Sequence, residues 1–156
     1  MKKALLLTAS HVAALTLGFA AGIYALPILI APEGPALSDI QSAQKQSRYK
    51  AEFRRDLAGS DPLHWGEGTV WVGAGAVSLT GRLAPGPDYK LYLSPEFVDS
   101  KEAFLRVKTS SARAGDIRTF DNFIVALDPA IDIEKFSTVV VWCETFSMFI
   151  SAARYR

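Results

Sequence analysis

Reactive side chains are scarce in this sequence of 156 residues, which contains one cysteine, Cys143, and two histidines, His11 and His64. A single cysteine excludes an intramolecular disulfide, a C-x-x-C redox pair and a C-x-x-C-H haem attachment site. The sequence also lacks the G-x-x-x-x-G-K-[ST] phosphate loop, the H-E-x-x-H zinc helix and the G-x-S-x-G nucleophile elbow. No recognisable catalytic constellation remains, so we expect a redox or binding module rather than an enzyme.

An excess of positive charge is missing too. Residues 32–156 hold all 16 acidic residues and 15 of the 17 basic residues, which gives this part of the chain a net charge of −1. Proteins that bind nucleic acid or anionic membrane surfaces usually present a basic patch. The sequence therefore predicts no nucleic-acid partner.

Charged residues are absent from Ala4 to Ala31, a run of 28 residues. About 20 apolar residues are enough to cross a bilayer as a helix, whereas the apolar part of a signal peptide is usually about 7–15 residues long. We therefore expect residues 1–31 to form an uncleaved signal-anchor transmembrane helix, with a cleaved signal peptide as the alternative. We expect a single-pass protein of the cytoplasmic (inner) membrane, and because Lys2 and Lys3 precede the run, the positive-inside rule predicts its orientation. Its N-terminus would be cytoplasmic and its remaining part periplasmic or extracellular.

Residues 32–48 are expected to be a membrane-proximal spacer between the anchor and the rest of the chain. Pro32 and Pro35 open it, and a capping-box pattern follows, with Ser38 three residues before Gln41. A short helix and a flexible stalk both fit this pattern.

Short β-rich segments separated by turns fill residues 49–156, and we expect roughly seven to nine strands there. The candidate segments are 49–53, 68–73, 76–81, 89–93, 103–108, 117–127, 137–143 and 147–155. The two-residue link between the second and third predicts a hairpin, and Asp128-Pro129 predicts a turn or a single helical turn over 128–136. This spacing is typical of an all-β domain, a small antiparallel β-sandwich or barrel, here tethered by one N-terminal transmembrane helix.

Two side chains are candidates for chemistry in the exported part. His64 stands beside Trp65 ahead of a predicted strand, where a packed or capped side chain is the common alternative to a ligand or a proton carrier. Cys143 lies in a very apolar strand and is most simply a small buried hydrophobe, yet alanine or valine would fill that volume without a risk of oxidation. Strand alternation places Trp142 and Glu144 on the face opposite Cys143. Cys143 therefore either faces the core or, if the strand ends there, lies beside a turn at the mouth of the barrel.

Three blocks of sequence resemble the DM-thirteen domain, the small domain of Skeletor-type animal proteins and of many bacterial membrane-anchored proteins. The blocks are "LHWGEGTV" around His64, "GPDYKLYLS" from Gly86 to Ser94, and "VVVWC" from Val139 to Cys143. The resemblance extends roughly from Tyr49 to Tyr155. It implies an electron-transfer domain in which Cys143 is the redox-active residue or a cofactor ligand, and His64 matches a histidine that is common in the family.

Two hypotheses for the function follow from these observations. In the first, the chain is a redox or cofactor-binding module. Cys143 then cycles through an oxidised form, or binds haem or copper together with His64, with Trp142 and Glu144 in support. The cytochrome domain that accompanies this family in larger proteins is not seen here, so the redox partner would be a separate protein. In the second, the chain is a non-catalytic binding module of the cell envelope, and Cys143 is structural.

Overall fold

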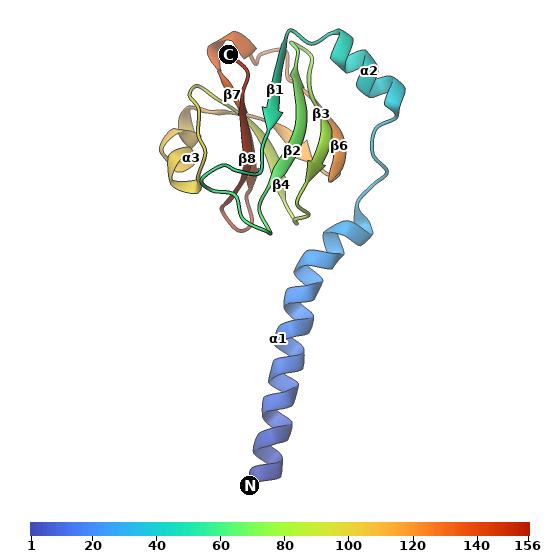
Figure 1. The fold of residues 1–156 in the computed structure, drawn as a ribbon, viewed down its shortest axis with the longest axis vertical. Helices are drawn as coiled ribbons and strands as arrows, with labels where there is room; N and C mark the ends of the chain where they lie inside the picture. The colour runs from blue at the N-terminus through green and yellow to red at the C-terminus, as the bar shows by residue number, and fades with distance from the viewer.

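Two four-stranded antiparallel sheets pack face to face in the computed structural model, which describes residues 1–156 (Figure 1). The first sheet has the strand order β1 (Tyr49–Phe53), β2 (Gly66–Val72), β3 (Ala76–Leu83), β6 (Asp121–Ala126). The second has the order β5 (Ala112–Ile117), β4 (Tyr89–Ser94), β7 (Thr138–Cys143), β8 (Met148–Arg154). The predicted all-β class is therefore confirmed, and the two sheets form a sandwich rather than a barrel.

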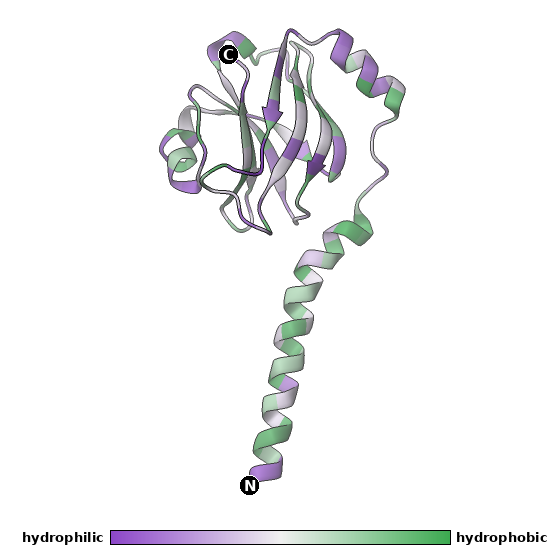
Figure 2. Ribbon diagram, in the orientation of Figure 1, coloured by the Kyte–Doolittle hydropathy of each residue, from purple (hydrophilic) through white to green (hydrophobic).

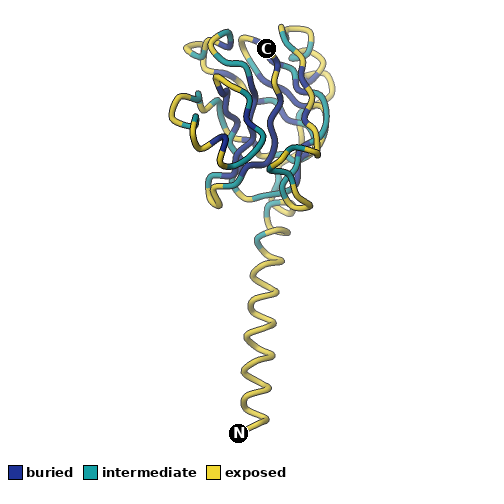
Figure 3. The backbone as a smooth tube through the Cα atoms, turned by 60° about the vertical axis from the view of Figure 1, so that its left-hand side comes forward, coloured by how far each residue is buried: buried dark blue, intermediate teal, exposed yellow.

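The interior of the sandwich is built from the alternate side chains that each strand turns inward. Val70 and Val72 of β2, Leu79 of β3 and Leu91 of β4 are examples, and each is fully buried. Strand β7 is buried along both faces, because its outer face is covered as well. In Figure 3 the buried backbone forms a continuous centre that runs through both sheets. The apolar run from Val139 to Cys143 is explained by this double cover.

The element that covers the outer face of β7 is a helix, which corrects the strand expected over 103–108. Helix α3 spans Lys101–Val107, and the 3-10 turn η1 (Lys108–Ser110) continues it. Ser100 caps the helix, since its hydroxyl accepts a hydrogen bond from the backbone N–H of Ala103. Phe104 is fully buried and packs its ring against Tyr92 and Trp142. The burial of Phe104 and the cap at Ser100 therefore favour a helix over the strand that was expected from the β-rich sequence of this segment.

A second correction concerns residues 117–127, which were expected to form one strand. Strand β5 ends at Ile117 and β6 begins at Asp121, so the chain leaves one sheet and enters the other within three residues. Asn122 adopts a positive φ of 57°, a conformation that asparagine tolerates better than most residues, and its side chain accepts a hydrogen bond from the Gly81 backbone N–H. By contrast, the single helical turn predicted within 128–136 is present as η2 (Ile133–Lys135).

The segment between the long N-terminal helix and the sandwich contains a short helix, α2 (Leu37–Lys45), that packs beside β3 (Figure 1). Ile40 is buried against the sheet, and the Gln44 amide donates a hydrogen bond to the Thr80 hydroxyl. The helix begins after Ala36 without a side-chain cap, so the predicted capping box is wrong and Ser38 lies inside the first turn. Of the two alternatives for this segment, the helix is the one observed.

Helix α1 (Lys2–Ile30) extends away from the sandwich as a single long rod. Its apolar residues cover all its sides, and none of them is buried (Figure 2). Its 29 residues correspond to about 43 Å, which exceeds the roughly 30 Å of hydrocarbon in a bilayer. The helix is therefore long and apolar enough to cross a membrane, although a signal sequence shares these properties.

Candidate functional site

Cys143 is the last residue of β7 and faces the interior of the sandwich. Its side chain lies on the same face of the strand as Val139 and Val141, and the residue is 2% exposed. The chain then turns through residues 144–147 into β8. Both of the alternatives for Cys143 thus hold at once, because the residue faces the core and also ends its strand beside a turn.

Trp142 and Glu144 belong to a different environment on the outer face of the same sheet. The Glu144 carboxylate accepts hydrogen bonds from the Tyr92 hydroxyl, from Lys108 Nζ at 2.6 Å and from Trp142 Nε1 at 3.3 Å. Burial opposes the ionisation of Glu144, but the hydrogen bonds from Lys108 and Tyr92 outweigh it and lower its pKa. These contacts fasten helix α3 and its following turn to the sheet, and they do not reach the Cys143 side of β7.

His64 lies in the loop between β1 and β2, where a tight turn orients its ring. The Asp61 carboxylate accepts hydrogen bonds from the backbone N–H groups of Leu63 at 2.7 Å and His64 at 2.8 Å. Its other oxygen is 2.8 Å from His64 Nδ1. Burial opposes the ionisation of Asp61, but these hydrogen bonds prevail and lower its pKa. A carboxylate on Nδ1 leaves Nε2 for a ligand, as in many metal-binding histidines.

His64 and Cys143, although distant in the sequence, line the same cavity, which has a volume of about 230 Å³. The cavity lies at the end of the sandwich that faces helix α1. Most of its lining is apolar, and its walls come from α1, the β1–β2 loop, the β3–β4 loop and strands β4, β7 and β8. The lining residues are Ala20, Ile23, Tyr24, Leu63, His64, Pro85, Gly86, Pro87, Tyr89, Cys143, Phe146, Met148 and Ile150.

Tyr89 and Met148 are the cavity residues that sequence reasoning missed, and both are cross-strand neighbours of Cys143. Tyr89 is opposite Cys143 in the β4–β7 pairing, and Met148 is opposite it in the β7–β8 pairing. Tyr89 is 3% exposed and its hydroxyl makes no hydrogen bond. Burial raises the pKa of Tyr89, so the hydroxyl stays a neutral donor. The only signal for Tyr89 in the sequence was its position in the "GPDYKLYLS" block.

The thiol of Cys143 is held in its protonated form by its surroundings. Burial raises its pKa, and the backbone N–H groups near Phe146 and Asp88 offset this effect only in part. Because the thiolate is the nucleophile and the metal ligand, the free thiol is a weak nucleophile in this environment. Its activation therefore requires a metal ion, an oxidant or a change of the surroundings.

The donors around the cavity suit some cofactors better than others. No group of three or more His, Cys, Asp or Glu side chains in the chain is arranged to hold a metal ion. The residues that line the cavity do, however, include Cys143, His64 and Met148, and soft sulfur donors with imidazole favour copper. The Met148 sulfur also lies 4.0 Å from Lys101 Nζ. A haem could not lie wholly inside this cavity, because about 230 Å³ is below the roughly 300–1,000 Å³ of typical sites for drug-sized ligands.

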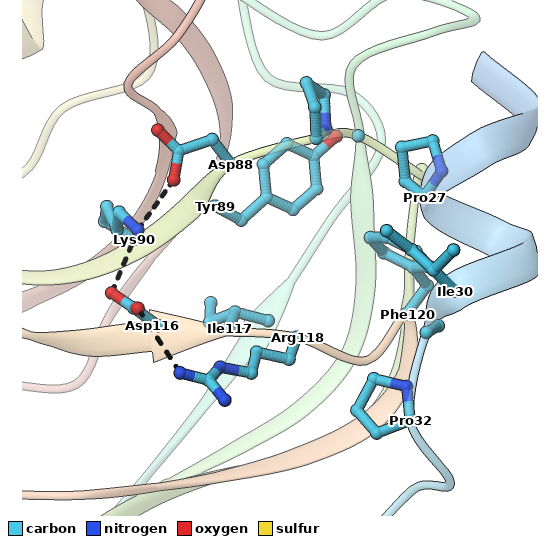
Figure 4. Close-up of a pocket in the computed structure, with 13 residues that line it drawn as sticks. Pro27, Ile30, Pro32, Asp88, Tyr89, Lys90, Asp116, Ile117, Arg118 and Phe120 are labelled. Atoms are coloured by element: carbon cyan, nitrogen blue, oxygen red, sulfur yellow. Dashed lines mark ion pairs between the residues drawn. The ribbon is translucent and has the colours of Figure 1, made fainter. Parts of the chain in front are cut away.

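A second cavity of about 260 Å³ (Figure 4) adjoins the first and shares Gly86, Pro87 and Tyr89 with it. Its polar side is an ion-pair cluster in which Lys90 Nζ is 2.6 Å from Asp88 and 3.0 Å from Asp116. The hydrogen bond from Lys90 lowers the pKa of both carboxyl groups. Since Lys90 and Asp116 are paired across β4 and β5, this cluster fixes the edge of the sheet. Tyr89, the neighbour of Lys90 in β4, lines both cavities.

These features define a class of protein: a β-sandwich that carries a long apolar helix and has one cysteine in the wall of a small cavity. The family model described as "Electron transfer DM13" matches residues 52–155. The chain therefore belongs to the DM13 electron-transfer family, which confirms the resemblance seen in the sequence. Neither the curated proteins nor the solved structures provide a match to the chain.

Proposed function

We propose that the protein is a membrane-anchored electron-transfer module whose redox centre is built on Cys143 and His64. The observation that carries this proposal is that the single cysteine and the only histidine of the sandwich line one cavity. Met148 lines the cavity as well. The three residues come from different segments, since Cys143 ends β7, His64 lies in the β1–β2 loop and Met148 begins β8. Family membership supports an electron-transfer role for the domain that holds them.

Copper is the cofactor that the donors of this cavity support best. Cys143, His64 and Met148 would hold the ion, and Asp61 would orient the imidazole of His64 through its Nδ1. Copper bound to these donors would supply a one-electron redox couple. The protein contributes a nearly dry surrounding, because Tyr89 and Ile150 are almost fully buried beside the thiol. The electron donor or acceptor for such a centre would be a separate molecule.

Helix α1 supports a proposal for the position of the module in the cell. With α1 as an uncleaved anchor, Lys2 and Lys3 at its start favour a cytoplasmic N-terminus. The sandwich would then be periplasmic or extracellular and would be attached to the cytoplasmic membrane by a single span. Residues 32–48 would connect the span to the domain, with α2 resting on the sheet.

A copper(I) titration of the full chain against a competing chelator tests the copper proposal. We expect one equivalent to bind to the wild type and the affinity to fall by about 10- to 100-fold in Cys143→Ser, in His64→Gln and in Met148→Leu. His11→Gln, which changes the other histidine of the chain, is the matched control and should bind like the wild type. Equal affinity in all five proteins would contradict a site at the cavity.

One observation favours a second function, a binding module of the cell envelope in which Cys143 is only structural. The thiol is 2% exposed, and burial raises its pKa, as expected of an inert core cysteine. In that case Cys143→Ala would leave all ligand binding unchanged, and the folded chain would bind no copper. The same titration therefore separates the two functions.

A further inference from the structure

We infer that the cavity beside Cys143 binds the ring of a membrane-soluble benzoquinone that enters from the bilayer. This inference rests on the proposed electron-transfer function, because that function is the reason to select a redox-active ring. The evidence consists of the level of the cavity relative to the membrane, its size and lining, and one hydroxyl that has no acceptor in the protein.

The cavity lies at the level where the membrane ends. About 20 residues are needed to cross the hydrocarbon core, and 20 residues counted from Ala4 end at Ile23. Ala20, Ile23 and Tyr24 form the helix side of the cavity, so the cavity meets the outer boundary of the bilayer. Tyrosine is enriched at this boundary, which suits the position of Tyr24.

The loops beside the cavity carry exposed apolar side chains on the same side as α1. Leu63 is 57% exposed and Phe146 is 48% exposed, and both line the cavity. Exposed apolar residues that lie at this level are stabilised in the interfacial layer of a membrane. A lipid-soluble molecule could therefore move from the bilayer into the cavity without crossing water.

The dimensions of the cavity match one substituted ring. A dry apolar cavity of about 150 Å³ in another protein binds benzene, so about 230 Å³ leaves room for a six-membered ring with small substituents. Nine of the 13 lining residues are hydrophobic. A long apolar tail on the ring would extend past Ile23 and Leu63 into the lipid.

A hydroxyl without an acceptor in the protein selects the chemistry of the ring. The Tyr89 side chain is 3% exposed, and its hydroxyl is a neutral donor with no acceptor in the protein. A quinone carbonyl oxygen in the cavity would accept its hydrogen bond, and the ring would then lie beside Cys143. A plain acyl chain would occupy the apolar part of the cavity but would leave this hydroxyl unpaired.

The test uses the full chain in phosphatidylcholine nanodiscs and a decyl-1,4-benzoquinone in which all ring positions are substituted, so that the thiol has no open carbon to attack. We expect saturable one-to-one binding in addition to the linear partition measured with empty nanodiscs. Tyr89→Phe should weaken this binding by about two- to tenfold, the worth of one neutral hydrogen bond. Ile23→Trp, which fills the lipid side of the cavity, should abolish it.

Leu26→Trp is the matched control, because Leu26 is on the same helix, is 56% exposed and does not line the cavity. It should bind the quinone like the wild type. Linear partition alone, or saturable binding that neither Tyr89→Phe nor Ile23→Trp changes, would overturn the inference. So would mass spectra of the intact complex in which phospholipid stays bound and is not displaced by the quinone.

The outcome is separable from that of the proposed redox centre. Cys143→Ser should retain most of the quinone binding, since the hydrogen bond to the ring comes from Tyr89. A chain that binds copper at Cys143 but no quinone would overturn only this inference. A chain that binds the quinone but shows no copper binding would overturn only the copper centre.

Discussion

The two faces of strand β7 differ in how completely their polar groups are satisfied. On the outer face, Trp142 Nε1, the Tyr92 hydroxyl and Lys108 Nζ all donate to one carboxylate, that of Glu144. On the inner face, to which Cys143 points, a cavity lies beside the thiol. There the hydroxyl of Tyr89, the cross-strand neighbour of Cys143 in β4, makes no hydrogen bond to the protein. A polar cluster in which every donor has an acceptor serves stability, whereas a hydroxyl without a protein acceptor beside a cavity is free to bind a ligand.

The largest expected effect on stability is on the outer face. Trp142→Ala removes a fully buried indole that packs against Phe104, and we expect the free energy of unfolding to fall by about 3–5 kcal/mol. Urea unfolding followed by circular dichroism of the sheets measures this change. If the two faces of β7 act independently, any Trp142→Ala protein that remains folded should still bind copper with wild-type affinity. Loss of copper binding in folded protein would show that the two faces act together.

Glu144→Gln is expected to have the next largest effect and to depend on pH. The substitution weakens the charged hydrogen bond from Lys108, which should cost about 1–2 kcal/mol at pH 7. Because folding lowers the pKa of Glu144, its ionised form stabilises the protein above the ordinary carboxyl pKa. That contribution is lost as the pH falls through the folded-state pKa.

The difference between Glu144→Gln and the wild type should therefore shrink as the solution is acidified below about pH 4. Unfolding curves at a series of pH values measure it. A constant difference across this range would mean that the charge of Glu144 does not stabilise the outer face.

The smallest expected effect on stability is on the inner face. Tyr89→Phe removes a hydroxyl that has no partner, so the free energy of unfolding should change by less than about 0.5 kcal/mol. The same urea experiment applies, with Tyr92→Phe as the matched control, because the Tyr92 hydroxyl donates to Glu144. A loss in Tyr89→Phe as large as that in Tyr92→Phe would mean that the Tyr89 hydroxyl serves the fold after all.

The contrast between the faces also separates what the sequence could predict from what it could not. Alternation in "VVVWCE" correctly assigned Cys143 to one face and Trp142 to the other, since side-chain direction in a strand is a local property. Helix α3 was missed because its position depends on burying Phe104 under a distant strand. Nothing local in the sequence could show that His64 and Cys143 line the same cavity, because this depends on how the β1–β2 loop lies across the end of the sandwich.

Trp142 and Glu144 were expected to support Cys143 only because they are its neighbours in the sequence. Residues that are adjacent in a strand point in opposite directions, so both side chains lie away from the cavity. The cross-strand partners Tyr89 and Met148 are the residues that flank Cys143 instead. Identifying them requires the strand register, which depends on the paired geometry of β4, β7 and β8.

Protein-film voltammetry of the full chain, loaded with one equivalent of copper(I), tests most directly whether Cys143 is the redox centre. We predict a reversible one-electron signal in the wild type that is lost in Cys143→Ala, is shifted in potential in His64→Gln, and is unchanged in His11→Gln. A wild type without any signal, or a signal that is the same in Cys143→Ala, would contradict the account.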